Sequence, residues 1–186
     1  MHDLAPITAL GGAEAREDVH GGVMLLERPD VALASYAARL GREEDAATHL
    51  AELIGAEAPG PGRAAFGSLA AWWTGPDAWM IEAPIDTHED LAARATEAAG
   101  GAASVTEQTD GWTRFDLSGA RVADVLERLT ALDVRAAGPG TAQRTTVDHL
   151  GCFAVWRTDG TVSVIGPRSS AGSLHHTILA AMRSAL

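Results

Sequence analysis

The chain contains no lysine, because all fourteen of its basic residues are arginines. Without a lysine ammonium group, the protein cannot form a Schiff base with a carbonyl substrate or complete the phosphate-binding loop of a Walker NTPase. Cys152 is the only cysteine, which excludes an internal disulfide and a zinc or redox site built from cysteine pairs. We therefore expect a protein of a reducing compartment, the cytoplasm.

Long apolar runs and a basic surface are also missing. No stretch of about 18 apolar residues occurs, so we expect no membrane span, and the first ten residues lack the basic start of a secretory signal. The net charge is −11 with no basic stripe to offset it, which opposes binding to phosphate backbones. Nucleic acids and membranes are therefore not expected partners.

Catalytic motifs are absent as well. The chain has no GxSxG or HExxH pattern, and its seven histidines lack the spacing of metal ligands. Cys152 precedes a β-rich run that should bury it. Gly138 and Gly140 look like part of a dinucleotide loop, but Gln143 breaks that pattern, so a turn is the better interpretation. We predict no metal site and no catalytic residue.

The order of the segments predicts an α+β fold in which helices cover antiparallel sheets. Residues 1–20 are expected to form an N-terminal arm and residues 21–186 a single domain of two halves, divided by a Pro/Gly-rich connection near 57–67. Thr87 and Ser118 are expected to cap helices, and Asp110-Gly111 to turn a strand pair. Expected strands cover 22–29, 31–41, 72–73, 79–81, 103–107, 112–117, 145–150, 153–157 and 161–165, and expected helices 43–54, 87–100, 118–129 and 173–185.

Three tryptophans surround the turn in the stretch LAAWWTGPDAWMIEAP, residues 69–84. Trp72 and Trp73 are adjacent in an expected strand, so they must point to opposite faces of its sheet. If one ring fills the core, the other needs a cover. That cover is either a helix of this chain or another protein, and Trp72, Trp73 and Trp79 are our candidate partner interface.

Four blocks of the sequence resemble the gamma subunits of heterotetrameric sarcosine oxidases. They are WTGPDAWMI (73–81), VTEQTDGWTRFDLSGARVADVLERLTALDVR (105–135), GTAQRTTVDHLGCFAVWR (140–157) and PRSSAGSLHHTIL (167–179). The resemblance implies a fold like the folate-binding domain of aminomethyltransferases, with two ferredoxin-like halves.

The resemblance also implies a function. Complexes of this family oxidatively demethylate sarcosine with oxygen, pass the one-carbon unit to tetrahydrofolate and release hydrogen peroxide. FAD, FMN, NAD and zinc belong to the alpha, beta and delta subunits, and no catalytic residue is assigned to the gamma chain. The expected role is thus a noncatalytic subunit that binds none of these cofactors itself. Trp112, Arg144 and Arg168 are candidates for a vestigial folate-like pocket, because aromatic stacking and arginine–carboxylate pairing suit a pterin-glutamate ligand.

Two alternatives stay open at this point. One is a freestanding folate-fold binding protein, related to one-carbon-transfer proteins or to the iron–sulfur-assembly proteins that carry K-G-C-Y-x-G-Q-E. Here Gly151-Cys152-Phe153 follows Leu150, and no Gly-Gln-Glu comes after it. The other is an independent small-molecule enzyme, which would need an acid/base or nucleophile constellation that the sequence does not display.

Overall fold

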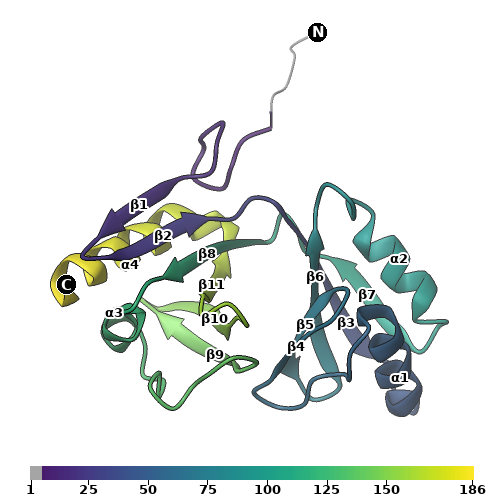
Figure 1. Cartoon of the computed structure of the whole chain (residues 1–186). Coiled ribbons are helices and arrows are strands. Elements are labelled where there is room, and N and C mark those ends of the chain that lie inside the picture. Colours follow the sequence, from purple (N-terminus) through teal and green to yellow (C-terminus); the bar gives the residue numbers. More distant parts are fainter. Residues whose placement is uncertain (1–5) are drawn as a thin grey trace, which may run out of the picture. The chain divides into compact units, whose positions relative to one another are not determined.

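The computed structural model describes residues 6–186, which form two compact units, each with its own sheet and core (Figure 1). The first unit comprises the chain up to Pro29 together with Gly111–Pro139 and Arg144–Leu186. The second comprises Asp30–Asp110 and Gly140–Gln143. The two units are thus assembled from interleaved parts of the sequence.

Six strands form the sheet of the first unit, in the order β1-β2-β8-β11-β10-β9. Two helices and a short 3-10 turn complete the unit. The longest helix of the described residues is α4, with 15 residues, and none of their helices is long and apolar enough to cross a membrane. The elements are β1 (Glu17–His20), β2 (Val23–Glu27), β8 (Trp112–Ser118), α3 (Val122–Leu129), β9 (Ala142–Val147), β10 (Leu150–Trp156), β11 (Val162–Pro167), η1 (Arg168–Ser170) and α4 (Ala171–Ala185).

The two faces of this sheet differ in chemistry because side chains alternate along each strand. Phe115 and Leu117 of β8 point to the face that α3 and α4 cover, where they join the apolar core of the unit. Trp112, Arg114 and Asp116 of the same strand therefore point to the opposite face, which we call the helix-free face. Along α3, apolar residues recur with helical period and complete the core: Val122, Val125, Leu126 and Leu129.

Five strands form the antiparallel sheet of the second unit, in the order β4-β5-β6-β3-β7. Figure 1 shows α1 and α2 together on one face of it. Much of the core between these layers is alanine, and Tyr36 fills the centre, where its hydroxyl donates to the Ala46 carbonyl at 3.1 Å. The elements are β3 (Val31–Ala38), α1 (Glu43–Ile54), β4 (Ala64–Phe66), β5 (Ala70–Gly75), β6 (Ala78–Pro84), α2 (Leu91–Ala98) and β7 (Ala103–Glu107).

The predicted α+β class, with antiparallel sheets covered by helices in two halves, is confirmed. Local signals located several elements well, most clearly the helix Glu43–Ile54. Three acidic residues occupy its first turn, where they complement the helix dipole. Gly55 ends it in the left-handed conformation with φ 68°, and its N–H donates to the Ala51 carbonyl.

Three local predictions are wrong. β7 and β8 do not pair around Asp110-Gly111, because β7 pairs with β3 in one sheet while β8 lies between β2 and β11 in the other. Ser118 does not cap α3, since it is the last residue of β8 and lies opposite Met24. Thr87 does not cap α2, whose N-terminal flanking residue is Asp90.

The divisions of the chain also differ from the sequence-based ones. The Pro/Gly-rich connection at 57–67 does not separate the halves, because it joins α1 to β4 and β5, and all three belong to the second unit. Residues 17–20 of the expected arm form strand β1, since they pair with β2. Residues 1–5 of that arm lie outside the described residues.

Gly67 provides a test of the second unit's packing. A Cβ atom placed there would lie 2.1 Å from the Ile54 carbonyl oxygen, which is main chain at the end of α1. We expect Gly67→Ala to lower the free energy of unfolding by at least about 2 kcal/mol, because the helix end must shift. Urea unfolding followed by circular dichroism measures the change.

Gly60→Ala is the matched control, because a Cβ atom at Gly60 meets nothing within 4 Å. It should be neutral or slightly stabilising. Equal effects of the two substitutions would contradict the packing described for Gly67.

Candidate functional site

Two of the three candidate pocket residues are neighbours at one end of the first unit's sheet. Trp112 begins β8 and lies opposite Pro167 of β11. Arg168 follows Pro167, its main-chain N–H donates to the Gly111 carbonyl at 3.1 Å, and its Nη2 donates to the Ile7 carbonyl at 3.3 Å. The ring of Trp112 packs against Phe153, with 5.6 Å between centroids and a 51° tilt. An aromatic pair and a guanidinium therefore share this end of the sheet.

Arg144, the third candidate, lies on β9 at the other edge of the sheet. β11 and β10 separate β9 from β8, which places the two strands about 14 Å apart at the usual strand spacing. Val147 of β9 points into the helix-covered core, so alternation places the exposed Arg144 on the helix-free face, the face of Trp112. The three residues thus share a face, and their joint role as a ligand pocket stays a prediction.

The tryptophans of the candidate partner interface lie in the second unit. Trp79 is a core residue, because it is 6% exposed, packs edge-on against Tyr36 and donates its indole N–H to the Pro59 carbonyl at 2.8 Å. Trp73 is half-buried and packs against the same core. Trp72 points to the opposite face, as alternation predicts, and is fully buried. Trp72 and Trp79 are therefore both buried, and Trp73 is the ring of the three with accessible area. The role of these residues as a partner interface stays a prediction.

A buried polar network that the sequence motifs do not indicate lies on the helix-free face of the first unit. Asp116 of β8 is 5% exposed, and both of its carboxylate oxygens accept hydrogen bonds. Arg114 donates to Oδ1 from Nε at 2.7 Å and to Oδ2 from Nη2 at 2.6 Å. Arg28 Nη1 donates to Oδ2 at 3.0 Å, and the Ser163 hydroxyl donates to Oδ1 at 2.5 Å. Arg157 Nε donates to Ser163 Oγ at 2.8 Å and extends the network to β10.

The hydrogen bonds of this network determine whether Asp116 can act as a general base. A buried carboxylate is tolerated when hydrogen bonds and opposite charges replace the water that it loses. Here three donor groups, two of them guanidinium ions, occupy the oxygens of Asp116, which holds the carboxylate as an acceptor within the fold. This arrangement suits a structural group better than a general base.

A signal for this network was present in the sequence. In the strand around TRFDL, the charged residues Arg114 and Asp116 alternate with Thr113, Phe115 and Leu117. Such alternation places two opposite charges on one face at neighbouring positions. Carboxylates usually lie on the surface, so the alternation alone does not predict a buried network. Whether Arg114 and Asp116 are buried depends on what covers the helix-free face of the sheet.

We expect Asp116→Ala to lower the free energy of unfolding by about 3 to 5 kcal/mol, because the buried Arg114 and Ser163 would lose the carboxylate that accepts their hydrogen bonds. Denaturant unfolding measures the change.

The control is Asp45→Ala, which removes the exposed Arg42–Asp45 ion pair at the start of α1. That substitution should cost no more than about 1 kcal/mol. A similarly small cost for Asp116→Ala would show that the buried network contributes little.

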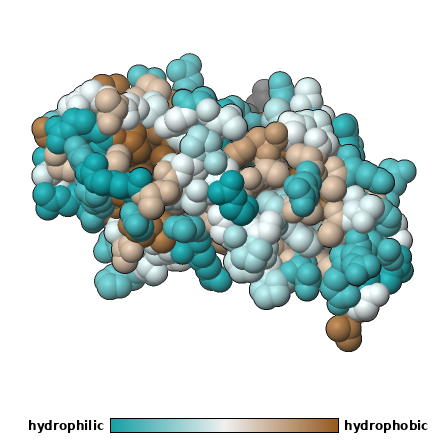
Figure 2. Space-filling view, turned by 60° about the horizontal axis from the view of Figure 1, so that its bottom comes forward, coloured by the Kyte–Doolittle hydropathy of each residue, from teal (hydrophilic) through white to brown (hydrophobic). Residues whose placement is uncertain are grey.

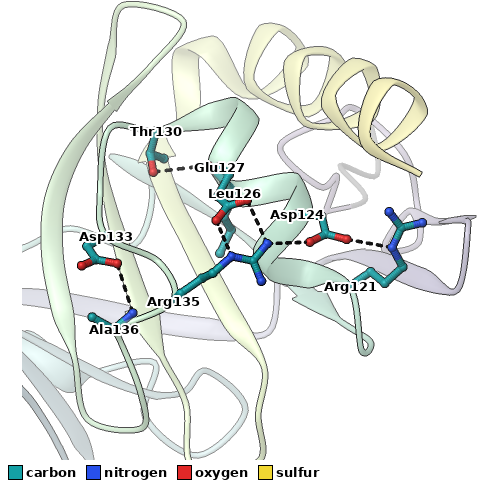
Figure 3. A network of polar contacts seen from close by, with 8 residues as sticks. All are labelled: Arg121, Asp124, Leu126, Glu127, Thr130, Asp133, Arg135 and Ala136. Carbon is teal, nitrogen blue, oxygen red and sulfur yellow. Dashed lines mark hydrogen bonds and ion pairs between the residues drawn. The ribbon is translucent and has the colours of Figure 1, made fainter.

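A second polar network lies on the surface of the first unit, between α3 and the segment that follows it (Figure 3). Arg135 donates to Glu127 from Nε at 2.6 Å and to Asp124 from Nη2 at 2.9 Å, and Arg121 Nε donates to Asp124 at 2.8 Å. The Arg121 and Arg135 guanidinium groups hold the pKa of Asp124 below its usual range. Arg121 also donates to the Ala185 carbonyl at 2.8 Å, which links this surface to the end of α4.

Two hollows lie outside the Trp112 end of the sheet. One, of about 340 Å³, adjoins α3, and Figure 2 shows brown apolar patches on this side of the chain, at the left, divided by teal hydrophilic side chains. Its lining is Val122, Ala123, Leu126, Val134, Arg135, Ala137, Trp156, Gly160 and Val162. The other, of about 390 Å³, lies in the second unit and is lined by Asp86, Thr87, Glu89, Asp90 and Arg94. Among residues 6–186, no group of three or more His, Cys, Asp or Glu is placed to hold a metal ion.

Cys152 is fully buried in the helix-covered core of the first unit, as the sequence predicted. Burial raises the pKa of its thiol to about 11. The thiol is therefore protonated near neutral pH, and the thiolate is the reactive form of cysteine. The arrangement gives a packed side chain instead of a nucleophile.

We expect native protein to react with a thiol reagent such as dithionitrobenzoate at least about a hundredfold more slowly than protein unfolded in urea, because both burial and the raised pKa suppress the thiolate. The absorbance of released thionitrobenzoate at pH 8 gives both rates. Equally fast labelling of the native protein would show that Cys152 is accessible.

No protein-family model and no curated protein matches the sequence. Among solved structures, the chain is similar to heterotetrameric sarcosine oxidase from Corynebacterium sp. U-96, with a TM-score of 0.78 and 20% identity over 90% of this chain and 87% of that one. It is also similar to the glycine cleavage system aminomethyltransferase T from Bartonella henselae, with a TM-score of 0.70 and 14% identity over 86% of this chain. The match covers 46% of the aminomethyltransferase, so the chain spans about half of that protein's length. The chain therefore has the α+β fold that these two proteins share, the folate-binding fold of the aminomethyltransferases.

Proposed function

We propose that this chain is a noncatalytic subunit, of the gamma type, in a heterotetrameric sarcosine oxidase. The observation that carries the proposal is the extent of the structural match, which covers 90% of this chain and 87% of the sarcosine oxidase chain. Two chains that match over such similar shares are of similar length. The aminomethyltransferase, by contrast, has about half of its chain outside the match. The match thus favours the counterpart of a small subunit over a shortened enzyme.

The chemistry of the chain supports a role without bond breaking. The carboxylate of Asp116 is occupied by Arg114, Arg28 and Ser163, and the thiol of Cys152 is buried with a raised pKa. Both are groups that an enzyme could use if they were accessible and free to exchange protons. In this fold both groups are buried. The subunit would act by offering a folded surface to the larger chains.

In the proposed complex, the reaction belongs to the partners. Sarcosine would be demethylated oxidatively in the cytoplasm, with the one-carbon unit passed to tetrahydrofolate and hydrogen peroxide released. FAD, FMN, NAD and zinc would be held by the alpha, beta and delta subunits. The end of the sheet that carries Trp112 and Arg168, with Arg144 across the same face, would be the remnant of a folate-like pocket.

Coexpression with the genes that adjoin it tests the proposal. We expect the affinity-tagged chain to copurify with subunits that carry flavin, identified by absorbance near 450 nm, and the eluted complex to release hydrogen peroxide on addition of sarcosine. The control is the same purification after coexpression with an unrelated flavoprotein.

The freestanding alternative predicts a different result. A chain that purifies alone and binds tetrahydrofolate tightly by calorimetry would support a folate-fold binding protein and contradict the subunit role. The similarity to aminomethyltransferase T, with the Trp112–Phe153 ring pair, is the observation that favours this second candidate.

A further inference from the structure

Strand β1 leaves one edge of the first unit's sheet open to hydrogen bonding. It pairs with β2 alone, across the two-residue turn Gly21-Gly22 (Figure 1). In such a hairpin, successive residues direct their main-chain groups alternately toward the partner strand and away from it. Arg16 faces β2, because its carbonyl accepts the Glu27 N–H at 2.8 Å. The N–H and C=O groups of Glu17 and Val19, one and three residues further on, therefore point away from β2.

The side chains at this edge combine an apolar and an acidic group on one face. Val19 lies opposite Met24, and Asp18 beside it reaches α4 on the helix-covered side. Alternation then places Glu17 and Val19 on the helix-free face. Val19 is 65% exposed, and it is the one exposed large apolar side chain of residues 6–186 that lies in a strand. An exposed apolar residue in the middle of an open edge is a feature that edge strands usually avoid.

The edge is also held in place by contacts on its other side. His175 Nε2 of α4 lies 2.8 Å from Asp18 Oδ2, and Arg16 Nε donates to the same oxygen at 2.9 Å. The Arg16 guanidinium, with His175, holds the pKa of Asp18 below its usual range. At the turn, a Cβ atom on Gly21 would lie 2.4 Å from Leu186 Cβ, so the turn packs closely on the end of the chain. A strand added here would meet a preformed edge, which lowers the entropy cost of binding.

We propose that β1 is the site where an extended segment of a partner protein adds to the sheet as a further strand. The partner segment places an arginine or lysine beside Glu17 and an aliphatic side chain beside Val19. Main-chain hydrogen bonds to Glu17 and Val19 provide affinity, and these two side chains provide selectivity. A second copy of this chain is a poor occupant, because each copy carries a net charge of −11. The inference rests on the proposed function for the identity of the partner, a flavin-bearing subunit.

Two substitutions test the edge in different ways. Val19→Pro removes an outward N–H that β2 does not use, so the hairpin keeps its own hydrogen bonds. Glu17→Arg keeps every main-chain group and reverses the charge. Leu40→Glu is the control, since Leu40 is 98% exposed in the turn that follows β3 of the second unit.

The measurement is the affinity of each variant for the purified flavin-bearing subunits, by biolayer interferometry with the full-length chain immobilised. We expect Val19→Pro and Glu17→Arg each to bind about tenfold more weakly, the effect of losing roughly one hydrogen bond or ion pair. Leu40→Glu should bind like the wild type. Melting temperatures establish that each variant is folded, and if Val19→Pro is not, Glu17→Arg carries the test.

The results that would contradict the edge proposal differ from those that would contradict the proposed function. Wild-type binding with no loss in either edge variant overturns this inference and leaves the proposed function standing. A wild-type chain that does not bind the flavin-bearing subunits overturns the proposed function and this inference with it. A wild-type dimer in sedimentation equilibrium that Val19→Pro abolishes shows that the edge pairs with a second copy, which overturns the partner proposed here.

Discussion

The hydrogen bonds and ion pairs of the buried Asp116 carboxylate connect the central strands of the first unit's sheet. Its partners come from three segments that are distant in sequence: Arg28 after β2, Arg114 on β8 itself and Ser163 on β11. β2, β8 and β11 are neighbours in the sheet. The carboxylate therefore accepts all of these hydrogen bonds when β8 lies between β2 and β11. A shift of β8 by one residue would turn Asp116 into the apolar core and move Phe115 out of it. The charge thus acts together with the apolar pattern to specify one register.

Burial bears on function because it makes two potentially reactive side chains inaccessible. Asp116 and Cys152 are buried groups with catalytic potential, and each is committed to the interior of the first unit. The surface contributes differently. Val19 and Glu17 lie on an open strand edge, and Trp112, Phe153 and Arg168 gather at one end of the same sheet. This distribution fits a protein whose contribution is recognition by its folded surface. The similarity to a chain of heterotetrameric sarcosine oxidase over most of both lengths shows a shared fold, and the partner complex stays the proposal made above.

Sequence patterns predicted elements where the signal is local. The helix Glu43–Ile54 has an acidic first turn and a glycine end, both read from neighbouring residues, and the opposite orientations of Trp72 and Trp73 follow from strand alternation. Pairing was predicted less well, because it depends on contacts across the chain. Asp110-Gly111 has the composition of a hairpin turn, yet the strands on either side join different sheets.

In the candidate site, too, local features were predicted better than contacts between distant parts of the chain. The sequence suggested Trp112 and Arg168, and strand register makes them neighbours, whereas Arg144 lies three strands away on β9. The Asp116 network escaped prediction because a carboxylate is buried or exposed according to what covers its face, which a single sequence does not state. Trp79 is a candidate for the interface because it flanks the same turn as Trp72 and Trp73, and in the structure its ring lies in the core of the second unit.

The central proposal is that this chain supplies structure to a demethylating complex and breaks no bonds itself. Its most direct test is a peroxidase-coupled assay of the purified, isolated chain with sarcosine, tetrahydrofolate and added flavins, compared with the copurified complex. We expect hydrogen peroxide formation by the complex and none above background by the isolated chain. Sustained turnover by the isolated chain, abolished when the protein is denatured, would contradict it.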